Sequence, residues 1–155
     1  MHYLDHKRDG KDCYVAIKLD MSKAYDRVEW GFIDQVMKKL GFHDSWICLI
    51  MRCITSISYS VLINGVAYGN IIPSRGLRQG DPLSSYLFLL CADGLSSLIS
   101  KAVRNQLING LSICKGCLMI THLFFMDDSL LFCKANGQEC QQLIEILRLY
   151  EAASS

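Results

Sequence analysis

The sequence has few of the features that mark membrane, secreted or low-complexity chains. It holds two prolines in 155 residues, both near one loop, and no internal repeat. No uninterrupted apolar run reaches the roughly 18 residues that a membrane-spanning helix needs. The first ten residues are polar, without the apolar block that directs secretion. The sequence therefore predicts one globular domain that stays inside the cell and has no membrane partner.

The charge is nearly balanced, with 16 basic and 15 acidic side chains and a net charge of +1. Contact with phosphates normally requires a basic surface, so this balance argues mildly against nucleic-acid binding. In a fragment, however, such a surface can lie on another part of the parent protein. The near-neutral net charge therefore does not exclude a nucleic-acid partner.

Eight cysteines are present without a secretory signal, which favours free thiols over disulfides. Cys114 and Cys117 form the single C-x-x-C pair, and a turn between two strands is the favoured interpretation. Half of a zinc site and a redox pair are the alternatives, but zinc needs four ligands and no second pair follows. The remaining cysteines are expected to be small buried hydrophobic residues: Cys13, Cys48, Cys53, Cys91, Cys133 and Cys140.

Apolar periodicity predicts an α+β fold in the order strand, two helices, hairpin, helix, hairpin, helix. Asn64-Gly65 is a strong hairpin signal, because both residues tolerate positive φ. Gly41 is expected to end one helix, and Asn136 with Glu139 to begin the last one. The expected elements span residues 14–19, 28–40, 46–54, 58–63, 66–72, 83–104, 119–125 and 129–133, followed by the last helix.

Three of these helices carry apolar stripes that are expected to face the core. The residues of the stripes, helix by helix, are Ile33, Met37 and Leu40; Leu87, Cys91, Leu95 and Leu98; and Cys140, Leu143, Ile144 and Leu147.

Two of the expected strands meet carboxylates. Asp127 and Asp128 interrupt an apolar run, where adjacent carboxylates are costly to bury unless a cation neutralises them. Alone, such a pair is more typical of an acidic turn that faces water. Asp20 ends a second apolar strand, in which Ala16 and Lys18 share its face. Side by side, the two strands would bring three carboxylates to one sheet edge, which is the ligand set of a two-metal phosphoryl-transfer site.

Three blocks of the sequence resemble those of reverse transcriptases of the LINE (non-LTR retrotransposon) type. Residues 16–26 (AIKLDMSKAYD) resemble the first-carboxylate block of that family. Residues 76–84 (GLRQGDPLS) resemble its nucleotide-binding loop and helix, and residues 122–132 (HLFFMDDSLLF) its paired-Asp hairpin. The blocks occur in the family's order, and the second is the most specific.

The resemblance implies an RNA-directed DNA polymerase with the α+β fold of a polymerase palm. It implies that Asp20 and Asp127 bind two Mg²⁺ ions, or Mn²⁺ in their place, with the backbone carbonyl of Met21 and the carboxylate of Asp128 in support. The implied partners are an RNA template, a DNA primer and a deoxynucleoside triphosphate. A nuclear location is compatible with the resemblance, although the sequence itself leaves the location open.

The resemblance also implies a nucleotide pocket. Tyr25 stands where the family places an aromatic gate that crowds a ribose 2′-hydroxyl, and Gln79 and Gly80 would line the pocket. Arg78 and Arg75 would approach phosphate or template. Taken without the resemblance, Tyr25 is more typical of a packed aromatic residue and Arg78 of a solvated loop charge.

The chain departs from the family pattern at Met126, where Ala is usual, and at Ser85, where Pro is common. Residues 1–155 are expected to form a single partial domain, the palm with part of the fingers. The N-terminal fingers and the C-terminal thumb are expected to be missing.

Three alternatives remain open. The alternatives to a reverse transcriptase are a non-catalytic remnant of one, an RNA-dependent RNA polymerase and an unrelated two-metal phosphohydrolase. Tyr25 disfavours the second, because a ribonucleotide enzyme needs a polar residue at that position. Residues 76–84 disfavour the third, because a phosphohydrolase does not explain them.

Overall fold

The computed structural model describes residues 13–20, 24–112, 114, 117–125 and 128–154. They form two compact units that combine helices with small antiparallel sheets, as the expected α+β class requires. The first unit contains the chain up to Ala24 and Ala92–Ala153, and the second contains Tyr25–Cys91 with the last two residues. The long helix α4 (Pro82–Arg104) contributes residues to both units.

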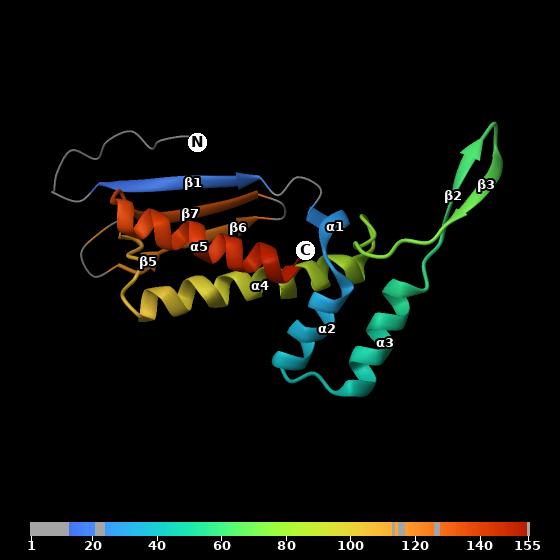
Figure 1. The fold of residues 1–155 in the computed structure, drawn as a ribbon, viewed down its shortest axis with the longest axis horizontal. Coiled ribbons are helices and arrows are strands. Elements are labelled where there is room, and N and C mark those ends of the chain that lie inside the picture. The colour runs from blue at the N-terminus through green and yellow to red at the C-terminus, as the bar shows by residue number, and fades with distance from the viewer. Residues whose placement is uncertain (1–12, 21–23, 113, 115–116, 126–127, 155) are drawn as a thin grey trace. The chain divides into compact units, whose positions relative to one another are not determined.

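The first unit is built on a three-stranded antiparallel sheet in the order β1-β7-β6 (Figure 1). Strand β1 (Tyr14–Asp20) pairs along its whole length with β7 (Asp128–Lys134), and β6 (His122–Phe125) pairs with the other edge of β7. The register sets Tyr14 opposite Lys134 at one end and Asp20 opposite Asp128 at the other. The expected first strand is therefore confirmed, and it ends at Asp20.

One face of this sheet is covered by the C-terminal part of α4 and by α5 (Gly137–Ser154) (Figure 1). Leu131 and Cys133 of β7 are fully buried against the two helices, with Ile17 and Leu19 of β1 packed beside them. The buried residues that these helices and their neighbouring loop add to this core are Leu95, Ile99, Ala102, Ile108, Leu143 and Ile146.

The strand expected over residues 119–125 is divided in two. Strand β5 (Met119–Ile120) pairs with β4 (Leu111–Ser112), whereas β6 begins at His122 and pairs with β7. Beside the break the backbones lie close together, because an added Cβ at Gly110 would lie 2.6 Å from the carbonyl oxygen of Ile120. Glycine thus permits this close approach.

Glu139 joins the start of α5 to two other segments. Its backbone N–H donates to Asn136 Oδ1 at 2.8 Å, which confirms the predicted helix start. Its buried carboxylate accepts hydrogen bonds from the backbone N–H of Asn109 at 2.8 Å and of Lys134 at 3.1 Å. The side-chain amides of Asn109 and Asn136 also donate to it, at 2.8 and 3.2 Å. Burial alone would raise the pKa of Glu139, but these hydrogen bonds outweigh it and lower that pKa.

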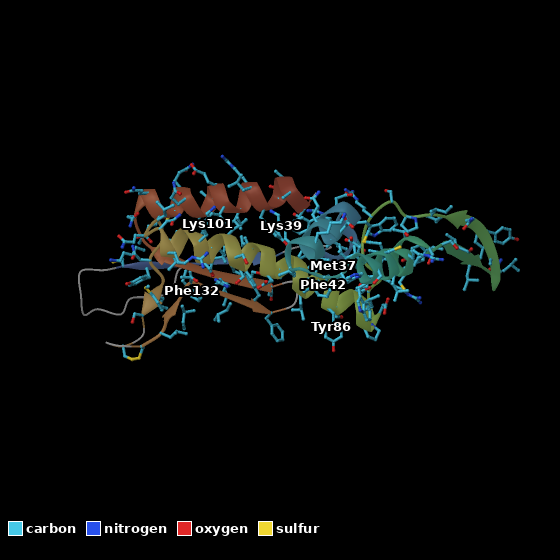
Figure 2. The ribbon with its side chains drawn as sticks, turned by 90° about the horizontal axis from the view of Figure 1, so that it is seen from below. Met37, Lys39, Phe42, Tyr86, Lys101 and Phe132 are labelled. Carbon is cyan, nitrogen blue, oxygen red and sulfur yellow. A yellow bond between two sulfur atoms is a disulfide. The ribbon has the colours of Figure 1, made fainter. Side chains whose placement is uncertain are left out.

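The second unit packs α2 (Trp30–Lys39) on α3 (Asp44–Thr55), after the short α1 (Ala24–Arg27). Met37, labelled in Figure 2, is fully buried in α2, as expected from the stripe. Gly41 follows the helix with φ of 82°, the left-handed conformation predicted for a helix end. The buried residues of the two helices are Ile33, Met37, Ile47, Ile50 and Ile54.

The predicted hairpin is present as β2 (Tyr59–Ile63) and β3 (Val66–Ile71), with positive φ at Asn64 and Gly65. Every residue of both strands is exposed. Residues 56–74 contain no charged side chain. The hairpin thus projects from the second unit as an uncharged, largely apolar ribbon.

Several burial expectations were wrong. Leu40 and Ile144 are exposed, because the buried faces of their helices run through Met37 and through Leu143 and Ile146. On α4 the stripe continues at Ile99, and Leu98 is partly buried. The cysteines that prove exposed, against expectation, are Cys13, Cys48 and Cys53.

Cys91 and Cys133 are buried as expected, and Cys140 is half-buried. Burial raises the pKa of the Cys91 and Cys133 thiols to about 12, so both stay protonated. Helix α4 has the length and composition of a membrane span, but core helices of soluble proteins share these properties. Its buried residues Leu87, Phe88 and Cys91 give it the character of a core helix.

We predict that Glu139→Gln lowers the free energy of unfolding at pH 7 by about 1–3 kcal/mol, because an amide donor would face backbone N–H donors in a buried position. Urea titration measures this loss. Because the folded-state pKa of Glu139 is lowered, its contribution is present above the ordinary glutamate pKa and is lost as the pH falls through the folded-state value. The difference between parent and variant should therefore shrink in acid.

Glu145→Gln on the same helix is the matched control, because Glu145 is exposed. It should shift the free energy of unfolding by no more than about 0.5 kcal/mol. Equal losses for the two variants would contradict a structural role for Glu139.

Candidate active site

The end of the β1–β7 ladder carries the expected carboxylates of the first unit. Asp20 and Asp128 are partners in the antiparallel register, and Phe125 of β6 is the partner of Asp128 on the other side. Met21 and Asp127, both predicted metal ligands, lie outside the described residues. Asp127 is nevertheless adjacent to Asp128 in sequence, in the connection between β6 and β7.

Asp128 forms an ion pair with Lys18. The Lys18 Nζ lies 3.0 Å from Asp128 Oδ1, and each side chain is about half-exposed, at 51% and 49%. In the register Lys18 is opposite Leu130, so the ion pair runs diagonally across the two strands. The sequence predicted the face of Lys18 but no function for it.

Ser129, the next residue in β7, is buried at 1% exposure. Its hydroxyl has no hydrogen-bond partner among the described residues. Within one residue, therefore, the strand passes from a half-exposed carboxylate to the core. This boundary keeps the carboxylate accessible to ions from solvent.

His122 is a second residue to which the sequence assigned no function. Its Nε2 lies 2.9 Å from Ser96 Oγ of α4, its Nδ1 lies 2.9 Å from Thr121 Oγ1, and its ring packs on Phe124. Burial lowers the pKa of His122, which favours the neutral ring. These contacts attach β6, the strand that leads to the Asp pair, to α4.

In the second unit, the loop that precedes α4 lies against the segment after α1. The N–H of Gly76 donates to the Val28 carbonyl at 2.8 Å, and the N–H of Leu77 to the Tyr25 carbonyl at 2.7 Å. Trp30 Nε1 donates to the Gly76 carbonyl at 2.8 Å. These three hydrogen bonds fix the first half of the loop to the segment that carries Tyr25.

The two glycines of this loop do different things. Gly76 has φ of 91°, and an added Cβ would lie 3.0 Å from the carbonyl oxygen of Asp26. The side of Gly76 where a Cβ would lie is therefore filled by the chain's own backbone. Gly80 has φ of 87° and nothing within 4 Å of an added Cβ, so its backbone is open on that side.

Arg78, Gln79 and Gly80 are all exposed in the second half of the loop. Asp81 precedes α4, and its Oδ1 accepts the N–H of Leu83 at 3.1 Å, which satisfies one donor of the first helical turn. Arg75 instead pairs with Glu29 at 3.3 Å. Neighbouring Tyr86 of α4 projects outward and is 69% exposed (Figure 2).

Tyr25 stacks on Phe88 of α4, with ring centroids 4.7 Å apart and an interplanar angle of 15°. Phe88 is buried at 6% exposure, whereas Tyr25 is half-buried. The contact gives Tyr25 one supported face, which is compatible both with packing and with a role as a rigid wall.

Cys114 and Cys117 lie between β4 and β5, in the expected connection between two strands. The structure joins them in a disulfide, so the expectation of free thiols is wrong for this pair. The three-residue separation brings the two sulfurs together within one turn.

No three His, Cys, Asp or Glu side chains form a metal-binding group among the described residues, which do not include Asp127. The donors that the β1–β7 end does offer are carboxylates, and hard oxygen ligands suit Mg²⁺. The half-exposed Asp128 and the register that sets Asp20 beside it fit a divalent cation.

The family model for reverse transcriptases (RNA-dependent DNA polymerases) matches residues 2–153. The chain therefore belongs to the reverse transcriptase family, as the three sequence blocks predicted.

Known relatives include mobile-element proteins. A Pol polyprotein from the type-1 retrotransposable element R2 of Popillia japonica is 32% identical over 84% of this chain and 20% of its own length. The R2DM polyprotein of Drosophila melanogaster is 27% identical over 79% of the chain and 11% of its own length. An uncharacterized mitochondrial protein of Arabidopsis thaliana is 47% identical over 44% of the chain and 56% of its own length. The chain thus spans about a fifth or less of the length of the two R2 polyproteins.

We predict that Gly76→Ala lowers the free energy of unfolding more than Gly80→Ala does. Both substitutions force alanine into a left-handed conformation, which costs about 1–2 kcal/mol. Gly76→Ala adds a clash with Asp26 and should cost about 1 kcal/mol more. Thermal and urea unfolding of the two variants measure the difference, and a larger loss for Gly80→Ala would contradict the assigned contacts.

Proposed function

We propose that this chain is the palm part of a reverse transcriptase that transfers a nucleotide from a deoxynucleoside triphosphate to a primer 3′-hydroxyl on an RNA template. The observation that carries the proposal is the β1–β7 register, which makes partners of Asp20 and Asp128 beside the sequence position of Asp127. The family match supports the same reaction.

In this proposal the chain's own groups position and neutralise charge. Asp20 and Asp127, with the Met21 carbonyl and Asp128, would hold two Mg²⁺ ions, or Mn²⁺. When bound, the ions would activate the 3′-hydroxyl and stabilise the negative charge on the phosphate that it attacks. The carboxylates would hold the ions in position before the reaction begins, so that little reorganisation of the site would be needed during nucleotide transfer.

As the resemblance implies, Tyr25 and the loop before α4 would supply the nucleotide contacts. Gln79 and Gly80 are exposed, and the open side of Gly80 lets a base or sugar approach the backbone. Arg78 is an exposed cation next to them that would contact phosphate or template. Tyr25, supported by Phe88 on one face, would exclude a 2′-hydroxyl through steric crowding.

We predict that Asp127→Asn reduces primer extension by at least about a hundredfold, because one metal-binding carboxylate is neutralised. The assay uses a polypeptide in which fingers and thumb sequence flank this chain, an RNA template with a DNA primer, and Mg²⁺. Asp93→Asn is the matched control, because Asp93 is exposed on α4 and has no assigned role. Extension by Asp127→Asn at the parent rate would refute the site.

We predict that Tyr25→Val increases incorporation of ribonucleotides relative to deoxynucleotides by about tenfold or more, because a smaller side chain leaves room for the 2′-hydroxyl. Single-nucleotide incorporation in the same polypeptide measures the ratio. Phe42→Val, another aromatic substitution in the second unit, should leave it unchanged. An unchanged ratio in Tyr25→Val would assign Tyr25 to packing alone.

A second candidate is a non-catalytic remnant of a retrotransposon protein. The net charge of +1 favours it, because a working polymerase needs a basic surface for its template. Magnesium-dependent DNA synthesis by the 155-residue chain alone would overturn this candidate.

A further inference from the structure

Lys18 is a cation at a place where the proposed function requires other cations. Its Nζ lies 3.0 Å from Asp128 Oδ1, and both side chains are about half-exposed. Lys18 also lies two residues before Asp20 in β1. An ammonium group thus pairs with Asp128, one of the carboxylates that would hold metal.

The charge balance at this strand end explains why a cation is useful there. Asp20 and Asp128 are partners in the β1–β7 register, which pairs two acidic residues at the ladder end, and a third, Asp127, precedes Asp128 in the sequence. Like charges at this spacing repel one another and destabilise the ladder end unless a cation compensates. When no ion from solvent is bound, Lys18 supplies one compensating positive charge from strand β1.

The ion pair between Lys18 and Asp128 also weakens the binding of a metal ion to Asp128. An ion that takes Asp128 Oδ1 as a ligand has to displace the Lys18 ammonium, and it then stays close to a positive charge. At about 6 Å in a solvated site, repulsion between a monovalent and a divalent cation corresponds to about a tenfold loss of affinity, which salt reduces further.

We propose that Lys18 is a positioning residue that holds Asp128 in the metal-free protein and competes with divalent cations for that carboxylate. The proposal rests on the metal site of the proposed function and adds a determinant of its metal affinity. Lys18 is then an internal counter-ion: it keeps the strand end paired before metal arrives and sets the cation concentration at which the site fills.

Mn²⁺ titration of the 155-residue chain, followed by electron paramagnetic resonance of the free ion, tests the proposal. Lys18→Met should bind Mn²⁺ about three- to tenfold more tightly than the parent. Lys18→Arg keeps the charge and should retain the parent affinity. Lys134→Met, at the opposite end of the β1–β7 ladder, is the matched control and should also leave the affinity unchanged.

Thermal unfolding gives an independent readout. With a chelator present, Lys18→Met should have a lower Tm than Lys18→Arg, which keeps the charge, because Asp128 loses its counter-ion. Saturating Mn²⁺ should raise the Tm of Lys18→Met by more than that of the parent. Lys18→Thr, which suits a half-exposed strand position, replaces Lys18→Met if the latter fails to fold.

The outcomes separate this proposal from the proposed function. If Asp128→Asn weakens Mn²⁺ binding but Lys18→Met leaves it unchanged or weaker, the metal site stands and the role of Lys18 is refuted. If the parent and Asp127→Asn bind Mn²⁺ equally, or the parent does not bind it, the metal site of the proposed function fails in this chain, and the role of Lys18 fails with it. If Asp127→Asn weakens binding but Asp128→Asn does not, the metal site stands and competition by Lys18 for Asp128 is refuted.

Discussion

The antiparallel pairing of β1 with β7 is the constraint on which the first unit depends. A slip of one residue in this register would turn Leu131 and Cys133 from the core to solvent, so burial of these side chains fixes the pairing. The same register makes Asp20 the partner of Asp128 at the ladder end. Packing in the middle of the strands thus decides which charged residues meet at their end.

Local signals predicted most of the fold. The local signals at Asn64-Gly65, Gly41 and Asn136 act within a few residues, so their effect can be inferred without the rest of the chain. The division of the expected strand at Thr121 could not be predicted this way. It appears as a change of pairing partner, from β4 for Met119–Ile120 to β7 for His122–Phe125, and apolar periodicity along one strand does not identify the partner strand.

For the candidate site, the three sequence blocks predicted residue identities and the family, because they are local and specific. Contacts between blocks were beyond that reasoning. Each of these contacts joins residues far apart in sequence. They are the ion pair between Lys18 and Asp128, the hydrogen bond between His122 and Ser96, and the packing of Gly76 on Asp26. From the sequence alone, a glycine that lets a ligand approach looks the same as one that, like Gly76, lets other backbone approach.

The placement of the carboxylates at a strand end, and not within the ladder, follows from their solvation. Asp128 is half-exposed, whereas the next residue, Ser129, is already buried at 1% exposure. One position further along β7, a carboxylate would lose its water and the reach of Lys18, and it would need to become protonated. Few positions in a strand therefore let a carboxylate stay ionised while it is attached to a rigid sheet. The boundary between core and solvent at Asp128 meets both requirements, and the apolar strands around it supply the rigidity.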